Sequence, residues 1–282
     1  MGSDWDCCPK ILTLPRSDAL IAFAGDTHYA YPLALQLARS IELYPASHDR
    51  RVDLFDLKGH CIRVFNQMRG MITDLPAGER SPGDPATWFL FGGYSWRFGR
   101  FAVWTIHWDA HLDAFTTRPA KLWRGQSGGR KLVVFAGDVS DEGELALVDL
   151  LRKRNKLSLG GLDMEPFEVL RDLIRSGDHD SIGGAPQIAK VYRYLQTQQF
   201  AVRWPTSDGV PHVMGRPALD YEDFVAPAID PDRPEVHARV ARETTGVSLA
   251  PPIGDDQAAW SEVPAEDREA ALVTVEGAPT QA

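Results

Sequence analysis

Three short clusters of histidine and acidic residues are the first candidates for chemistry in this sequence. They lie at residues 26–28, 107–113 and 178–180. Carboxylate and imidazole groups at such spacing are ligands that Mn²⁺ and similar ions accept. The same residue types also recur at turns and helix N-termini, where their side chains bond to backbone N–H groups. At each cluster a metal site and a set of turn or cap residues are therefore both open interpretations.

The middle cluster has the most specific pattern. His107 is followed by Asp109, His111 and Asp113 at alternate positions. This run resembles the arginase/agmatinase family, and the resemblance implies a binuclear manganese ureohydrolase with Asp109, His111 and Asp113 as ligands. The later aspartate-rich run of that family is missing here. A Gly-Asp-x-x-Asp run at 137–141 resembles one motif of the calcineurin-like phosphoesterases, but the spacing to the other motifs differs. The ureohydrolase is kept as the alternative function.

Composition is that of an ordinary globular protein. The chain has 282 residues, of which 44% are hydrophobic and 24% charged, so it can bury a large core. No apolar run approaches the roughly 20 residues that cross a bilayer. Three cysteines, two of them adjacent, form neither a disulfide framework nor a zinc motif. We therefore expect a cytoplasmic protein with no membrane partner.

Negative charge is concentrated at the C-terminal end. Residues 221–282 hold 13 Asp or Glu and 4 Arg, a balance of −9 that equals the net charge of the whole chain. The rest of the chain is neutral, which argues against a nucleic-acid partner because phosphate binding needs a basic face. The acidic segment is also rich in proline, alanine and glutamate. We expect a folded domain over 1–220 and a largely disordered extension over 221–282, with one short helix at about 234–244.

The apolar pattern predicts runs of strands separated by pairs of helices. Such an order indicates α+β layers rather than alternating βα units. One helix is expected to begin near His28, and three others are expected at about 53–71, 142–154 and 165–176. The expected strands cover 10–14, 19–24, 88–96, 101–108, 131–135, 187–194, 200–204 and 213–219.

Four short motifs in this order resemble the proteasome β-subunit family, and most closely the bacterial peptidase that partners an AAA+ unfoldase. A lysine, Lys10, begins the first strand, and a Phe-Ala-Gly run at 23–25 leads into the first long helix. Glycine motifs follow at 91–94 and 135–138. The last motif is the run at 180–191, which contains Asp180, Gly183 and Gly184. The resemblance covers about residues 9–200.

This resemblance implies an αββα four-layer sandwich, the architecture of N-terminal-nucleophile (Ntn) hydrolases such as the threonine proteases. It implies that Lys10 favours a deprotonated nucleophile and that Asp180 orients the α-amine. Backbone N–H groups within Ala22 to Gly25 would stabilise the oxyanion. Gly137, Gly183 and Gly184 would form turns at the active site. The resemblance further implies a peptide or protein substrate, a closed homo-oligomeric ring and no cofactor or metal.

The sequence departs from that family at its start. In the family, two strands that carry the nucleophile precede the lysine, whereas here only residues 1–9 do. Cys7 and Cys8 are the available nucleophiles, but both adjoin the lysine in sequence. We expect either a hydrolase whose first strand is encoded upstream, or a non-catalytic relative that serves as a binding or assembly module. Missing strands would also uncover aromatic residues of the hairpin at 88–108, which predicts self-association.

Overall fold

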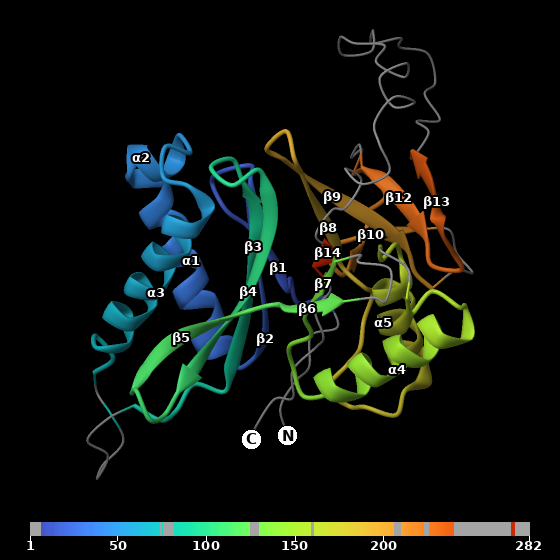
Figure 1. Ribbon diagram of the computed structural model, residues 1–282, viewed down its shortest axis with the longest axis horizontal. Helices are drawn as coiled ribbons and strands as arrows, with labels where there is room; N and C mark the ends of the chain where they lie inside the picture. The colour runs from blue at the N-terminus through green and yellow to red at the C-terminus, as the bar shows by residue number, and fades with distance from the viewer. Residues whose placement is uncertain are drawn as a thin grey trace, which may run out of the picture.

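A computed structural model shows a mixed α+β fold, as the order of the elements predicts (Figure 1). It describes residues 7–73, 75, 82–124, 130–158, 161–205, 210–222, 226–239 and 272–273. Five helices form within these ranges: α1 (Thr27–Leu43), α2 (Pro45–His48), α3 (Leu54–Arg69), α4 (Ser140–Lys153) and α5 (Glu165–Ser176). None of these described helices combines the length and apolarity that a membrane span requires.

The first half of the chain forms a five-stranded antiparallel sheet in which neighbours in sequence are neighbours in space. Its strands are β1 (Ile11–Thr13), β2 (Ala19–Gly25), β3 (Thr87–Ser95), β4 (Arg100–Asp109) and β5 (Ala114–Pro119). The inner strand β2 is buried along its whole length. Because both of its faces are covered, its sequence is a continuous apolar run and does not alternate.

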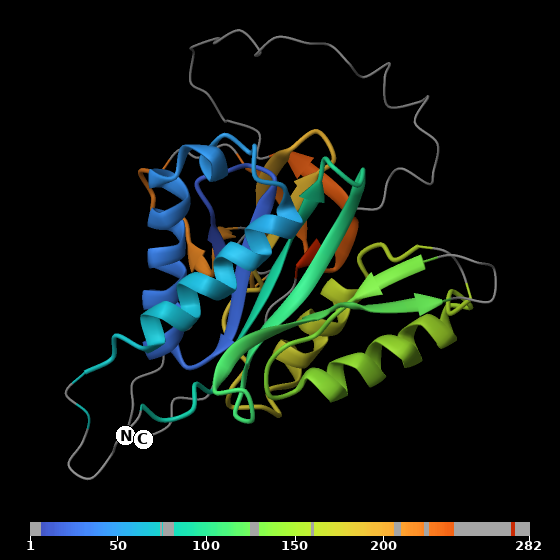
Figure 2. The ribbon, with the colours of Figure 1, turned by 60° about the vertical axis from the view of Figure 1, so that its left-hand side comes forward.

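Helices α1 and α3 cover one face of this sheet (Figures 1 and 2). Ile21 and Phe23 of β2 point toward this face and pack in one core with Leu37 of α1 and Phe65 of α3. The helices begin where the sequence provides caps. The carboxylate of Asp26 accepts the N–H of His28 at 2.7 Å at the start of α1.

The second half of the chain forms a sheet of order β11-β10-β9-β12-β13, in which β12 runs parallel to β9. A further strand, β8, pairs with the first part of β9 and also with β14. These strands are β8 (Ile188–Tyr192), β9 (Gln196–Arg203), β10 (Pro211–Val213), β11 (Arg216–Pro217), β12 (Pro227–Asp230), β13 (Arg233–Arg239) and β14 (Leu272–Val273). Strands β6 (Lys121–Arg124) and β7 (Arg130–Val133) form a separate two-stranded sheet.

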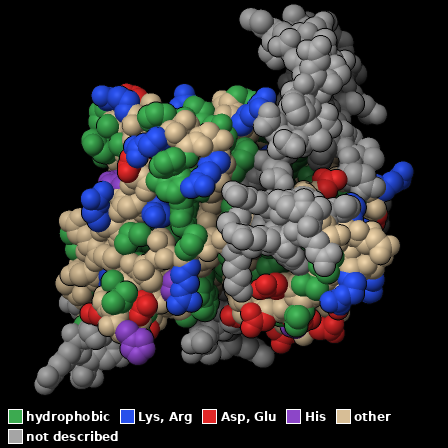
Figure 3. Space-filling model, in the orientation of Figure 1, with side chains coloured by type: hydrophobic (Ala, Val, Ile, Leu, Met, Phe, Trp, Pro, Cys, Tyr) green, Lys and Arg blue, Asp and Glu red, His purple; other side chains and the backbone are tan. Residues whose placement is uncertain are grey.

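Strand β8 is covered on both faces. Ala189 and Val191 pack against the first sheet, in one core with Leu20 and Ala22. Ile188 points the other way, because side chains alternate along a strand, and it packs with residues of α5. Helix α4 then packs on α5. Acidic side chains gather over this α4–α5 part of the surface in the view of Figure 3.

The aromatic hairpin of β3 and β4 is covered more fully than expected. Of its aromatic side chains, only Trp96 and Phe98 are exposed, and both lie at the turn between the strands. The others pack on α1 and α3 or toward β8. The prediction that this hairpin exposes a large aromatic surface is therefore wrong, because both faces of the first sheet are covered.

Three strands, β12, β13 and β14, lie in the segment expected to be a disordered extension. Ala228 and Ile229 of β12 are buried beside β9. The folded part therefore continues to at least Arg239, beyond the expected boundary at residue 220. The prediction of a helix over about 234–244 is wrong for the described residues of that range, because residues 233–239 form a strand. Prolines occur at the first position of β12 and in the turn after it, where a missing N–H is tolerated. Apart from 272–273, the remaining extension lies outside the described residues.

Truncation of the chain after residue 226 is expected to cost much more stability than truncation after residue 239. The shorter chain loses the buried side chains of Ala228 and Ile229 and the hydrogen bonds between β12 and β9. We expect its free energy of unfolding to be lower by about 3 kcal/mol. Urea unfolding of the two truncated chains measures the difference. Equal midpoints would mean that β12 is not part of the folded core.

Candidate functional site

Lys10 lies immediately before β1, and its side chain is buried over Phe23 of the neighbouring strand β2. The amine Nζ is 4.6 Å from the centre of the Phe23 ring, and the N–H of Phe23 donates to the carbonyl of Lys10 at 3.0 Å. Burial lowers the pKa of Lys10, and the nearby Cys8 sulfur opposes part of this shift. A buried amine of this kind can take part in proton transfer more readily than a surface lysine.

The thiol of Cys8 lies next to this lysine and contacts helix α1. Its Sγ is 2.9 Å from the hydroxyl of Tyr31, which itself donates to the carbonyl of Pro9 at 3.0 Å. Because the phenol has one proton, the thiol is the donor in the contact with Tyr31. Burial, followed by the interaction with Cys8, raises the pKa of Tyr31. Cys8 is therefore a hydrogen-bonded thiol that is engaged in local structure.

Gln187 fixes the backbone on which both residues stand. Its side-chain Oε1 accepts the N–H of Lys10 at 2.8 Å, and its Nε2 donates to the carbonyl of Cys8 at 2.7 Å. Gln187 is buried and immediately precedes β8. The contact thus joins the first strand of one sheet to β8. Neither Gln187 nor Tyr31 is among the residues that the sequence analysis proposes.

Of the two residues proposed for the oxyanion site, Gly25 is better placed than Ala22. Ala22 is fully buried and lies between β1 and β3, opposite Ile11 on one side. Gly25 lies past the N-terminal end of β1, which is also where Lys10 lies, and it has a positive φ of 94°. A backbone N–H offered to a substrate at this end would therefore come from the Gly25 turn.

Asp180 and the later glycines do not join this cluster through a contact. Asp180 is exposed in the segment between α5 and β8, and within the described residues it forms no ion pair. Gly183 and Gly184 lie in the same segment, and Gly184 has a φ of 75°. Gly137, with a φ of 119°, forms the turn before α4. All three glycines thus lie in turns or loops, and the segment between α5 and β8 bonds to Lys10 through Gln187.

The histidine–acid clusters serve turns, caps and ion pairs. The carboxylate of Asp109 accepts the N–H of His111 at 3.0 Å in the turn between β4 and β5, while Asp113 has a φ of 47°. His179 pairs with Glu142 at 3.2 Å. In the part of the chain that the structure describes, no three His, Cys, Asp or Glu side chains are placed to hold a metal ion. The ligand set Asp109, His111 and Asp113 therefore has no support from this arrangement.

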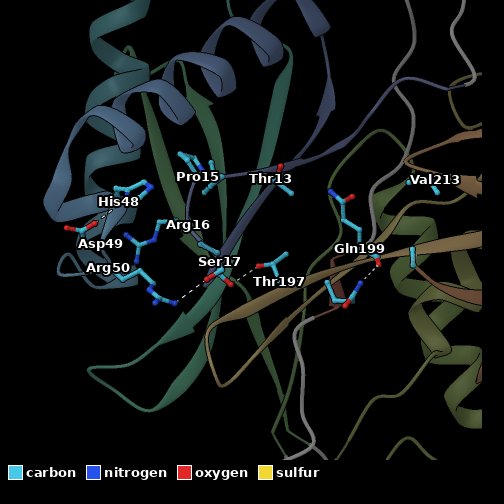
Figure 4. Close-up of a pocket in the computed structure, with 14 residues that line it drawn as sticks. Thr13, Pro15, Arg16, Ser17, His48, Asp49, Arg50, Thr197, Gln199 and Val213 are labelled. Carbon is cyan, nitrogen blue, oxygen red and sulfur yellow. Dashed lines mark hydrogen bonds and ion pairs between the residues drawn. The ribbon is translucent and has the colours of Figure 1, made fainter. Parts of the chain in front are cut away.

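A cleft of about 900 Å³ opens at the other end of β1 (Figure 4). It is lined by the β1–β2 turn, the residues after α2 and part of β9. Thr197 Oγ1 donates to the carbonyl of Ser17 at 2.8 Å, and Arg50 donates to Ser17 Oγ at 3.1 Å. The Thr197 bond joins the two sheets at this end, and the Arg50 bond holds the β1–β2 turn against the residues after α2. Lys10 does not line the cleft, so the two features are separate.

Comparison with known proteins adds no assignment. No protein-family model matches the chain, and no curated protein matches it.

Replacing Lys10 with methionine is expected to raise the free energy of unfolding at pH 7. Because burial lowers the pKa of Lys10 in the folded state, the unfolded chain binds its proton more tightly, and a charged Lys10 costs stability. That cost disappears as the pH rises through the ordinary value of 10.5. The gain from K10M should therefore shrink between pH 7 and pH 10.5. Denaturant unfolding at both values measures it, with the exposed Lys153 changed to methionine as the control. A loss of stability in K10M at pH 7 would contradict this prediction.

Proposed function

We propose that this protein is a proteasome-like hydrolase with the four-layer αββα sandwich of the Ntn hydrolases, and that it hydrolyses amide bonds in peptides or proteins. The observation that carries the proposal is the buried Lys10 at the start of β1, beside the Phe23–Gly25 end of β2. The order of the hydrophobic cores supports it. Helices α1 and α3 pack on the first sheet, that sheet packs on β8, and β8 packs on α5.

The chemistry assigned to these residues is attack on an amide carbonyl. In this proposal Lys10 favours the deprotonated form of the attacking group, which is its nucleophilic form. The oxyanion receives a backbone N–H from the turn at Gly25. Asp180 is given no role, because its side chain is exposed and forms no ion pair within the described residues.

The nucleophile itself is proposed to lie on a strand encoded upstream of Met1. Cys8 is not assigned this role, since its thiol is bonded to Tyr31. Without such a strand, the same fold would serve as a non-catalytic binding or assembly module. Assembly into a homo-oligomer in the cytoplasm belongs to the same proposal.

The test compares two proteins, the chain from Met1 and the chain extended by the codons that precede Met1 in frame. Each is incubated with a β-lactone probe, which acylates activated hydroxyl and thiol groups, and with a fluorogenic peptide. We expect labelling and hydrolysis in the extended protein only. Both should fall at least 100-fold in K10A and stay unchanged in K153A, which alters an exposed lysine of α4. Equal activity in K10A, or no labelling of either protein, would contradict the hydrolase proposal.

A further inference from the structure

The cleft at the end of β1 away from Lys10 has no role in the proposed function. It lies between the two sheets, and side chains enter it from both of them (Figure 4). Thr13 lies two residues after Ile11, so both side chains point from β1 toward the second sheet. Gln199 pairs with Ala189, which packs against the first sheet, so the Gln199 side chain points back toward β1. The gap between the sheets is therefore lined by polar side chains at this position.

Two of these polar side chains have no partner in the part of the protein that the structure describes. They are the half-buried carboxamide of Gln199 and the hydroxyl of Thr13. A carboxamide offers two N–H donors and a carbonyl acceptor, so it matches a peptide-like amide, which offers one of each. A few such polar groups in a cleft fix the orientation of a bound molecule. The free carboxamide thus indicates a ligand that carries an amide.

Arg50 makes one end of the cleft cationic. Its Nη1 donates to Ser17 Oγ at 3.1 Å and to a backbone carbonyl of the β8–β9 turn at 3.3 Å. Both acceptors are neutral, and among the described residues no carboxylate pairs with this guanidinium. The neighbouring Asp49 pairs instead with His48 at 3.1 Å and with Arg51 at 3.7 Å. An arginine that is held in place and keeps N–H groups free is suited to binding a carboxylate.

The rise of β9 sets the size of the ligand. Thr197 bonds to Ser17, as Arg50 does, so Thr197 marks the cationic end of the cleft. Gln199 lies two residues further along β9, which is about 7 Å at the usual rise of a strand. Val213 lines the cleft beyond Gln199 and provides an apolar surface. The volume of about 900 Å³ is that of a small-molecule site.

We infer that this cleft binds a small organic acid whose chain carries an amide about 7 Å from the carboxylate and an apolar group beyond the amide. N-acylated dipeptides have this chemistry. The carboxylate binds Arg50, the outer amide bonds to Gln199, and the acyl group lies at Val213. The inference does not depend on the proposed hydrolase activity, because Lys10 does not line the cleft.

Isothermal titration calorimetry of the full chain tests the inference. The probe is hippuryl-glycine (N-benzoyl-glycylglycine), and hippuryl-glycinamide is its uncharged match. The acid should bind with a Kd below about 1 mM. The amide should bind at least about tenfold more weakly, because it lacks the charge that Arg50 recognises. Absence of saturable binding of the acid, or equal binding of the two compounds, would overturn the inference.

Variants at the cationic end locate the site. R50M should weaken binding of the acid by at least about tenfold and leave binding of the amide unchanged, so that the two compounds then bind alike. R51M changes a neighbouring arginine whose side chain is 67% exposed and does not line the cleft. It should have no effect. An unchanged affinity of R50M for the acid would overturn the inference.

Variants on β9 decide the case if R50M does not fold, which its urea midpoint will show. Q199L should weaken binding of both compounds by at least about fivefold, because both carry the amide. Q196L changes an exposed glutamine outside the cleft and should weaken neither. Unchanged binding in Q199L would overturn the inference. K10A should bind the acid normally, so failure of this site and failure of the proposed hydrolase function are distinguishable.

Discussion

Alanine at position 25 is expected to lower the free energy of unfolding by about 3 kcal/mol or more. Gly25 has a φ of 94°, and a Cβ added there would lie 2.0 Å from the carbonyl oxygen of Ala86. That carbonyl accepts the N–H of Asp26 at 2.8 Å, so it cannot rotate away without loss of the bond that joins the N-cap residue of α1 to the segment before β3. The clash involves backbone atoms, and the positive φ adds strain for any residue with a Cβ. Urea unfolding of G25A and the unchanged protein measures the loss.

Gly59 provides a matched control for this substitution. It lies within α3, and nothing is found within 4 Å of a Cβ added there. G59A should raise the free energy of unfolding by about 0.5–1 kcal/mol, because alanine is the better helix former. If G25A behaved like G59A, β2 would not end in the tight turn described above. The proposed oxyanion position at Gly25 would then lose its structural basis.

Removal of the Asp18 carboxylate is expected to cost about 3–5 kcal/mol. Arg16 and Asp18 form a fully buried pair in the β1–β2 turn, with two hydrogen bonds of 2.6 Å each. Arg16 also donates to the carbonyls of Ser47 and Val52, at 2.9 and 3.1 Å. D18A would leave a buried guanidinium without its counter-charge. The expected result is a large fall in the melting temperature of D18A.

An exposed ion pair gives the comparison for D18A. Arg39 and Glu42 form a pair on the surface of α1 at 2.5 Å. E42A should change stability by less than about 0.5 kcal/mol, since water screens this pair. The double variant R16M/D18L should lose less than D18A, because it removes both charges together. A D18A loss no greater than that of E42A would show that the buried pair is not formed.

Much of the first sheet could be predicted from local sequence. The apolar run of β2 and the glycine that ends it mark a buried strand, and Asp26 marks the start of α1. The aromatic runs on either side of residues 96–99 mark the β3–β4 hairpin. These elements are determined by nearby residues, so a pattern of apolar positions and caps is sufficient to find them.

Other elements could not be predicted because their signals are weak or distant. Strand β5, with the sequence Ala-Phe-Thr-Thr-Arg-Pro, lies at a sheet edge and needs few apolar residues. Strands β12 and β13 lie within a proline-rich, acidic segment whose composition predicts disorder. They form because β9 offers an edge on which β12 can pair, which is a tertiary effect.

The residues of the candidate site also fall into those that local sequence predicts and those that it does not. Lys10 and Gly25 come together through one hairpin, so the register of adjacent strands predicts their proximity. Gln187 reaches the same place across a sequence separation of 177 residues, and no local pattern reveals such a contact. The acidic clusters mislead because a carboxylate that caps a turn, as Asp109 does, has the same sequence signature as a metal ligand.

The long-range bonds at the two ends of β1 have a consequence for the order of folding during synthesis. Gln187 holds the start of the strand across 177 residues, and Thr197 holds the following turn across 180. A ribosome that adds roughly 5–20 residues per second makes these partners many seconds after β1 has emerged. The first sheet and its two helices can therefore assemble early, whereas the bonds from Gln187 to Cys8 and Lys10 form only when the last third of the protein arrives. Contacts of such high sequence separation are slow to form and are exposed to competing pairings until they do.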